Sequence, residues 1–136
     1  MAARRTPKRA ELALADTSVF IAAEQQRPLL GPPPERVAVS VITVGELRLG
    51  VLAAEDGPAR ARRLETLSRA ETLDPVPVDG PVAHAWATLR LALRDHGRRM
   101  PLNDSWIAAT AMSLGVPVVT QDEDYVELPG LAVIKV

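Results

Sequence analysis

Short apolar runs alternate with helical patterns along this chain, and that alternation constrains its fold more than any other feature. The runs 12–15, 37–41, 116–120 and 131–136 are rich in small or β-branched apolar residues, as buried strands are. Apolar residues at helical spacing fill the segments between them. This order is typical of an α/β domain with a mainly parallel sheet.

Gly, Pro and Asp mark where the expected helices begin and end. We expect helices over about 19–27, from about Thr43 to 52, after Pro58, from Asp79 to Gly97, and through Ile107 up to Gly115. On the helix after Pro58, we expect Ala61, Leu64 and Leu67 to face inward. The proline-containing segment from Asp74 is expected at a sheet edge, or in no strand at all.

Composition excludes several classes of protein. The 136 residues include no cysteine, which rules out disulfides, thiolate metal sites and cysteine nucleophiles. No apolar run approaches the ~20 residues that span a bilayer, and the basic start lacks the apolar segment of a secretory signal. We expect a cytoplasmic protein without membrane association, in which residues 1–10 form a flexible basic tail and 11–136 a single domain.

The charges are unevenly distributed, although the net charge is only −1. Setting five acids aside leaves 12 acidic residues against 16 basic ones, a balance of +4. These five are Asp16, Glu46, Asp104, Asp122 and Asp124. An acidic centre on a basic body suits an enzyme that handles phosphate backbones, although arginines on helices are also common as plain solvated faces.

Carboxylates follow the predicted strands at the points where those strands end. Asp16 ends the first strand, Glu46 lies early in the helix after the second, and Asp122 and Asp124 follow the third. Asp104 opens the helix before the third strand, so its place depends on topology. Ligand sites of parallel sheets form beyond the carboxyl ends of the strands. Each acid also has a simpler explanation, as a helix cap, a first-turn acid or a solvated turn.

Carboxylates that are brought together repel one another unless a cation neutralises them. With no cysteine and only His84 and His96 in the chain, zinc is a poor candidate. Oxygen ligands from Asp and Glu suit Mg²⁺, with Mn²⁺ as an alternative, and either one ion or a pair fits the sequence. Because Asp16→Asn removes one negative charge from the cluster, we expect that variant to melt at a higher temperature than the metal-free parent.

Four segments resemble, in order and spacing, the acidic motifs of the PIN domain, and more narrowly those of VapC-type toxins. These segments are ADTSVF, SVITVGELRLG, LNDSWIAATAMSLG and VPVVTQDEDY. The resemblance covers 12–136 and implies a three-layer PIN-like domain with helices on both faces of the sheet. It also implies a Mg²⁺-dependent endoribonuclease, the toxin of a type II toxin–antitoxin pair, which uses a metal-activated water and leaves a 5′-phosphate and a 3′-hydroxyl.

The resemblance assigns roles to individual residues. It places the family's four catalytic acids on Asp16, Glu46, Asp104 and Asp122, with Asp124 as an additional or alternative metal ligand. Among these, Asp16 and Asp104 are expected to be direct ligands of the better-occupied ion. It also implies that the hydroxyls of Thr17, Ser18 and Thr120 support the centre. Gln121 departs from the pattern, because relatives frequently carry Arg there, and a local phosphate contact is therefore in doubt.

The resemblance also implies partners: RNA, a VapB-like antitoxin whose extended segment covers the groove near the acids, and a homodimer within a hetero-oligomer. The antitoxin is expected on the helices that carry Val44–Leu52 and Ala61–Leu67. Trp86 is expected in the core, while Trp106, Phe20 and Tyr125 remain candidates for stacking on bases.

Three other interpretations of the sequence remain open. The first is a PIN-type RNA-processing nuclease that has no antitoxin. The second is a phosphoacceptor receiver module, which needs an acidic pair beside the first strand where Asp16 stands alone. The third is a non-catalytic binding module whose acids cap helices.

Overall fold

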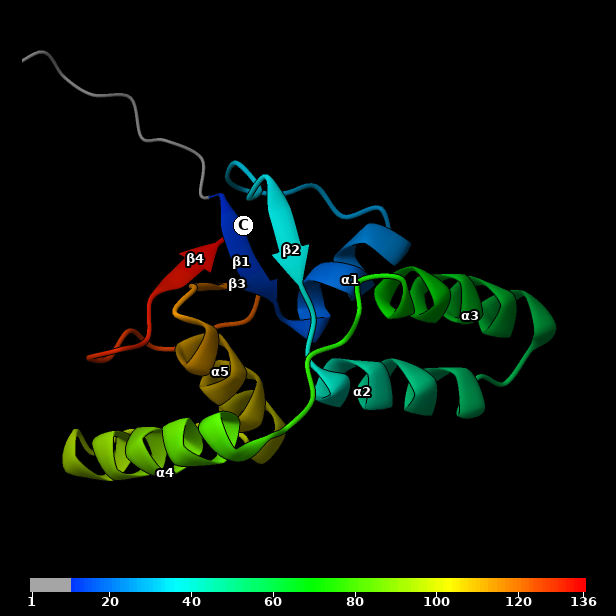
Figure 1. Cartoon of the computed structure of the whole chain (residues 1–136). Helices are drawn as coiled ribbons and strands as arrows, with labels where there is room; N and C mark the ends of the chain where they lie inside the picture. The colour runs from blue at the N-terminus through cyan, green and yellow to red at the C-terminus, as the bar shows by residue number, and fades with distance from the viewer. Residues whose placement is uncertain (1–10) are drawn as a thin grey trace, which may run out of the picture.

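The computed structural model describes residues 11–136, so the predicted basic tail of residues 1–10 lies outside the described part. Strands and helices alternate along the chain (Figure 1). In chain order they are β1 (Leu12–Ala15), α1 (Thr17–Glu24), β2 (Arg36–Ala38), α2 (Val41–Leu52), α3 (Gly57–Glu71), α4 (Gly80–Asp95), α5 (Leu102–Leu114), β3 (Val118–Thr120) and β4 (Val133–Lys135). None of these helices is long and apolar enough to cross a membrane.

The four strands form one sheet in the order β2-β1-β3-β4, and every neighbouring pair is parallel. Leu14 pairs with Ala38 on one side and with Val118 on the other. Because all strands run the same way, their carboxyl ends lie at one edge of the sheet, and Asp16 follows β1 at that edge.

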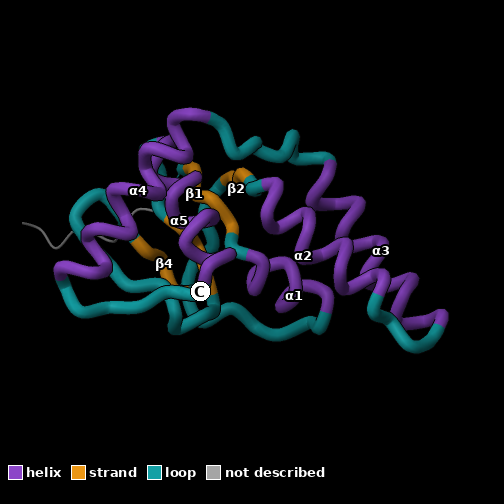
Figure 2. The backbone as a smooth tube through the Cα atoms, turned by 90° about the horizontal axis from the view of Figure 1, so that it is seen from below, coloured by secondary structure: helices purple, strands orange, loops and turns teal. Residues whose placement is uncertain are grey.

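Helices cover both faces of the sheet, as the family resemblance implied (Figure 2). Successive strand residues point to opposite faces. Leu14 accordingly packs with Leu89 of α4 and Ile107 of α5, whereas Ala13 and Ala15 pack on the other face, towards α1. Both faces are therefore apolar, which explains why the strands read as continuous apolar runs.

The helices α2 and α3 form a hairpin beside α1 (Figure 1). Its core contains Leu47 and Val51 of α2 with Leu67 and Ala70 of α3. The predicted inward face of α3 is partly wrong, because Ala61 is exposed and Leu64 is 45% exposed. The buried face of α3 lies closer to its carboxyl end.

Several predicted boundaries shift in the structure. The second strand was expected over 37–41, but Ser40 is the N-cap of α2, and its hydroxyl accepts a hydrogen bond from the Ile42 amide (3.0 Å). The helix expected from Val19 begins at Thr17. The segment after Asp74 forms no strand, as one of the two expectations had it, and contributes only an isolated bridge between Val76 and Ser40.

The turn and cap signals around α4 and α5 are confirmed. The Asp79 carboxylate accepts a hydrogen bond from the Val82 amide (3.0 Å) at the start of α4. After α4 and α5, Gly97 and Gly115 adopt positive φ angles of 62° and 68°, which glycine adopts without strain.

Candidate metal centre

Asp16 lies at the end of β1, where the residue is 3% exposed. Oδ1 accepts a hydrogen bond from the Tyr125 hydroxyl (2.8 Å), and Oδ2 accepts one from the Thr120 hydroxyl (2.9 Å). The Ser18 amide adds a longer bond to Oδ2 (3.3 Å), so Asp16 is also the N-cap of α1. Asp16 is therefore both the N-cap of α1 and a candidate residue of the metal centre.

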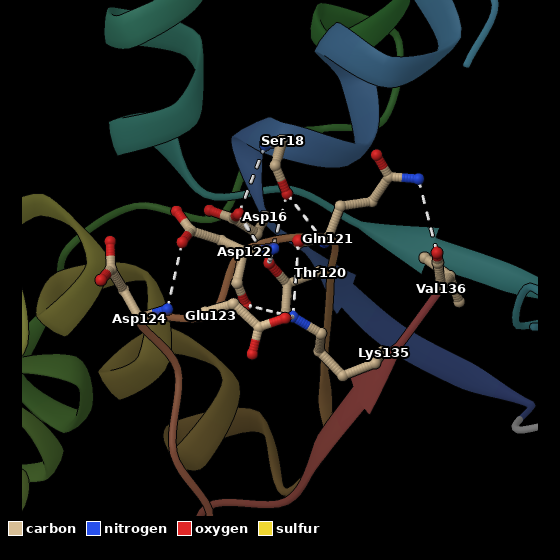
Figure 3. Close-up of polar contacts among 9 residues, drawn as sticks. All are labelled: Asp16, Ser18, Thr120, Gln121, Asp122, Glu123, Asp124, Lys135 and Val136. Atoms are coloured by element: carbon tan, nitrogen blue, oxygen red, sulfur yellow. Dashed lines mark hydrogen bonds and ion pairs between the residues drawn. The ribbon is translucent and has the colours of Figure 1, made fainter. Parts of the chain in front are cut away.

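The hydroxyls around Asp16 form a hydrogen-bond chain with a defined direction (Figure 3). The Thr120 hydroxyl uses its only hydrogen to donate a hydrogen bond to Asp16. In its contact with the Ser18 hydroxyl (3.2 Å), Thr120 is therefore the acceptor. Ser18 in turn accepts from the Gln121 amide (3.0 Å), and Thr120 also accepts from the Asp122 amide (2.8 Å). This network ties α1 to the end of β3 and holds Asp16 in one orientation.

Glu46 is oriented by a second pair of hydroxyls. The Thr17 hydroxyl donates to Glu46 Oε1 (2.7 Å), and Thr17 therefore accepts the hydrogen bond of the buried Thr43 hydroxyl (2.9 Å). Since Thr43 and Glu46 lie one turn apart on α2, this contact joins α2 to the start of α1 beside Asp16.

Three further carboxylates form a group of their own. One oxygen each from Asp104, Asp122 and Asp124 lies within 4.8 Å of the others. Asp122 Oδ1 accepts a hydrogen bond from the Asp124 amide (3.0 Å). This bond folds the loop after β3 back towards the first turn of α5. Asp104 is not the cap of α5, because the helix begins at Leu102 and Pro101 is the N-cap position.

The charges of the other four predicted acids all act on Asp104. The pKa of Asp104 is raised from 3.8 to about 7, first by burial and then by the charges of Asp16, Asp122, Glu46 and Asp124. The charge of Asp122 is the main reason why the pKa of the Asp124 carboxyl is also raised. Among the described residues, no hydrogen-bond donor reaches the Asp104 carboxylate, so none of them offsets its burial with a hydrogen bond.

Lys135 of β4 is a site residue that the sequence did not reveal. Its ammonium group donates to the main-chain oxygens of Asp122 (2.9 Å) and Gln121 (3.4 Å), and it pairs with the exposed Glu123 carboxylate (2.8 Å) (Figure 3). Lys135 thus holds the backbone of the loop that carries Asp122 and Asp124. An isolated lysine in a terminal strand gives no sequence signal for this role.

The aromatic residues occupy places other than those expected. Tyr125 is 5% exposed, and burial followed by the Asp16 charge raises the pKa of its hydroxyl, so it is a partner of Asp16 and no platform for bases. Trp86 is only half-buried: its ring stacks on Trp106 at 4.5 Å, and its indole N–H donates to the Ser105 hydroxyl (3.0 Å).

The Gln121 side chain points towards Val136, away from the acids (Figure 3).

This set of oxygens fits a hard divalent cation. The closely spaced ligands are carboxylates, which Mg²⁺ and Mn²⁺ prefer, and a cation would offset both the burial and the neighbouring charges that raise the pKa of Asp104. Asp104, Asp122 and Asp124 lie close enough to share one ion. Asp16 uses three of its roughly four acceptor positions within the protein and keeps one free.

Comparison with known proteins agrees with this fold. The profile of the PIN domain family matches residues 13–131. The chain is 48% identical over 122 residues to Ribonuclease VapC5 of Mycobacterium tuberculosis, covering 89% of this chain and 90% of the relative. It is 49% identical over 129 residues to Ribonuclease VapC4 of the same organism, covering 91% and 96%.

A solved structure supports the same kinship. The crystal structure of VapBC-5, a member of the VapBC family of toxin-antitoxin systems from M. tuberculosis, matches with a TM-score of 0.78 and 45% identity. The match covers 93% of this chain and 98% of the solved chain. The chain therefore belongs to the PIN domain family, within its VapC-type group.

Proposed function

We propose that this chain is a divalent-metal-dependent endoribonuclease and the toxin of a type II toxin–antitoxin pair. Its relatives at 48% and 49% identity are named ribonucleases. The observation that carries the metal dependence is the group of Asp104, Asp122 and Asp124, in which Asp104 has a pKa of about 7. A capping or solvated role for these acids does not require that they approach one another.

In this proposal, the chain's own residues bind the cation and orient the groups around it. Asp104, Asp122 and Asp124 hold the cation, with Mg²⁺ favoured and Mn²⁺ accepted. Asp16, fixed by Thr120 and Tyr125, directs its free acceptor position towards the same centre. A bound divalent ion lowers the pKa of a water and stabilises charge on a phosphate, so no side-chain nucleophile is needed.

Glu46 has a different role, because the Thr17 hydroxyl fixes one of its oxygens and Glu46 lies outside the group of three. We assign it to orienting a water or a second cation. Its charge also contributes to the raised pKa of Asp104, as expected for a carboxylate that faces the same space.

A cleavage assay tests this function. Structured RNA is incubated with the purified chain in Mg²⁺ or Mn²⁺, with and without chelator, and Asp104→Asn is compared with Glu127→Gln. Glu127 is an exposed acid and serves as the matched control. We expect metal-dependent cleavage by the parent and the control, and a loss of about 100-fold or more in Asp104→Asn. Cleavage that persists in chelator, or that is unchanged in Asp104→Asn, contradicts the proposal.

The antitoxin is assigned to the groove that α2 forms with α1 and α3. A cavity of about 280 Å³ lies there, lined by residues that include Ile21, Leu47, Gly50 and Arg63. Glu46 also lines it, so a segment in this groove would reach a site acid. An arginine of such a segment could pair bidentately with the carboxylates and compete with the metal. Leu49 and Leu52, each 66% exposed, add apolar surface on α2.

A further inference from the structure

We propose that a second surface, the arginine cleft, binds the phosphate backbone of the RNA outside the metal centre. This cleft lies between the carboxyl-terminal half of α4 and the segment that returns from α4 to α5. It has a volume of about 570 Å³ and is lined by residues that include Arg90, Arg94, Arg98, Arg99, Leu93 and Met100. None of the described residues that line it is acidic.

The guanidinium groups of the arginine cleft are less committed to protein acceptors than those of Arg60, Arg63 and Arg69 on α3. On α3, Arg69 pairs with Glu65 (2.6 Å), while Arg60 and Arg63 donate to the main-chain oxygens of Ala54 (3.1 Å) and Gly50 (2.7 Å).

In the cleft, Arg94 has only a longer contact with its exposed neighbour Asp95 (3.6 Å). Within the described residues, the guanidinium groups of Arg98 and Arg99 make no hydrogen bond or ion pair, and only the Arg98 backbone amide donates, to the Leu93 oxygen (2.8 Å). The cleft thus gathers four guanidiniums beside a single paired acid, Asp95, and a polyanion would relieve the repulsion among them.

Direct contacts connect the arginine cleft to the metal centre. Arg90 lies over the Trp86 ring, 5.7 Å from its centroid, and Trp86 stacks on Trp106. Trp106 lies two residues after Asp104 on α5, and the Trp86 indole bonds to Ser105, the neighbour of Asp104. The stacked rings therefore fix α4, and with it the cleft, relative to the acids. Arg90 and Arg94 lie one turn apart, about 6 Å along the helix.

The choice of RNA as the ligand rests on the proposed function, because a nuclease with an acidic centre needs attractive charge elsewhere to hold a polyanion. Arginine suits this task, since its planar guanidinium pairs with phosphate oxygens in a fixed geometry. Binding of this kind releases counterions and therefore weakens as salt rises. The arginine cleft would set affinity for longer RNA without altering the chemistry at the metal centre.

The experiment measures binding of fluorescent single-stranded RNA in chelator, so that no cleavage occurs, over a series of salt concentrations. The test variant is Arg98→Gln with Arg99→Gln. The control is Arg62→Gln with Arg69→Gln, which removes the same charge from α3. We expect the cleft variant to bind about tenfold more weakly and to lower the slope of log K against log salt by about 1.4. The control should stay close to the parent.

Three outcomes separate the arginine cleft from the proposed function. If the parent does not cleave RNA with any divalent metal but the cleft variant still binds RNA more weakly, the nuclease assignment fails and the cleft stands. If the parent cleaves RNA and both double variants bind equally well, the cleft proposal is overturned. It is also overturned if the cleft variant changes only the oligomeric mass in sedimentation, because the cleft is then a contact between copies of the chain.

Discussion

Removing the charge of Asp104 should stabilise the metal-free protein. In the folded chain this carboxyl has a pKa of about 7 against 3.8 for the ordinary group. The difference of about three pKa units corresponds to an upper limit of about 4 kcal/mol at pH 8, at 1.36 kcal/mol per unit. Water reaching the carboxylate lowers this value, so we expect a gain of about 2–4 kcal/mol for Asp104→Asn. In a chain of this size the melting temperature should rise by on the order of 10 °C.

The sign of the pH dependence follows from the direction of the shift. Because the folded state binds the Asp104 proton more tightly than the unfolded state, the stability of the parent falls as pH rises from about 4 to 7 and then levels off. The advantage of Asp104→Asn should therefore grow with pH, from at most about 2 kcal/mol at pH 5 to its full value at pH 8.

Urea denaturation in chelator at pH 5 and pH 8 measures this advantage, and added Mg²⁺ should stabilise the parent more than the variant. The matched control is Asp16→Asn. This variant removes the same charge. Its amide has only one acceptor oxygen, however, so its NH₂ group would face one of the two hydroxyls, of Thr120 and Tyr125, that donate to Asp16. The structure therefore opposes the sequence-based expectation for this variant, and Asp16→Asn should be less stable than the parent. An Asp104→Asn protein no more stable than its parent at pH 8 would refute the argument that the buried, crowded Asp104 charge destabilises the metal-free fold.

Two further predictions concern the surroundings of the metal centre. Lys135→Met should weaken metal binding several-fold in calorimetry, because the carbonyls of Gln121 and Asp122 lose their shared donor, whereas Glu123→Gln should leave it unchanged. Equal affinities in the two variants would remove Lys135 from the site. Leu49→Asp on the exposed face of α2 should abolish co-purification with the antitoxin while RNA cleavage by the isolated chain continues; retained binding would place the antitoxin elsewhere.

The sequence predicted the elements whose signals are local. The run Leu12–Ala15 is confirmed as β1 to the residue, and the caps and turns at Asp79, Gly97 and Gly115 lie where predicted. The second strand was overextended because Val39, Ser40 and Val41 favour a strand by composition, while the Ser40 hydroxyl caps α2. A serine between valines does not reveal which of these preferences prevails.

The candidate site was predicted only in part, because its acids follow from strand direction whereas their partners depend on packing. Asp104 comes from a helix whose position relative to the sheet the sequence left open, and the fold brings it to Asp122 and Asp124. Contacts over long separations, such as Tyr125 to Asp16 and Lys135 to the loop after β3, have no periodic signal. On α3, Leu64 suggested a buried stripe that tertiary packing does not use.

The directed hydroxyl chain beside β1 limits which groups can supply protons during a reaction. The Thr120 hydroxyl already donates its hydrogen bond to the Asp16 carboxylate, and the Thr17 hydroxyl donates its own to the Glu46 carboxylate. Neither alcohol can therefore protonate a departing oxygen without first breaking an internal bond. That task passes to solvent, because Asp104, whose pKa is about 7 in the metal-free chain, has no proton to give once it binds the proposed cation as a carboxylate.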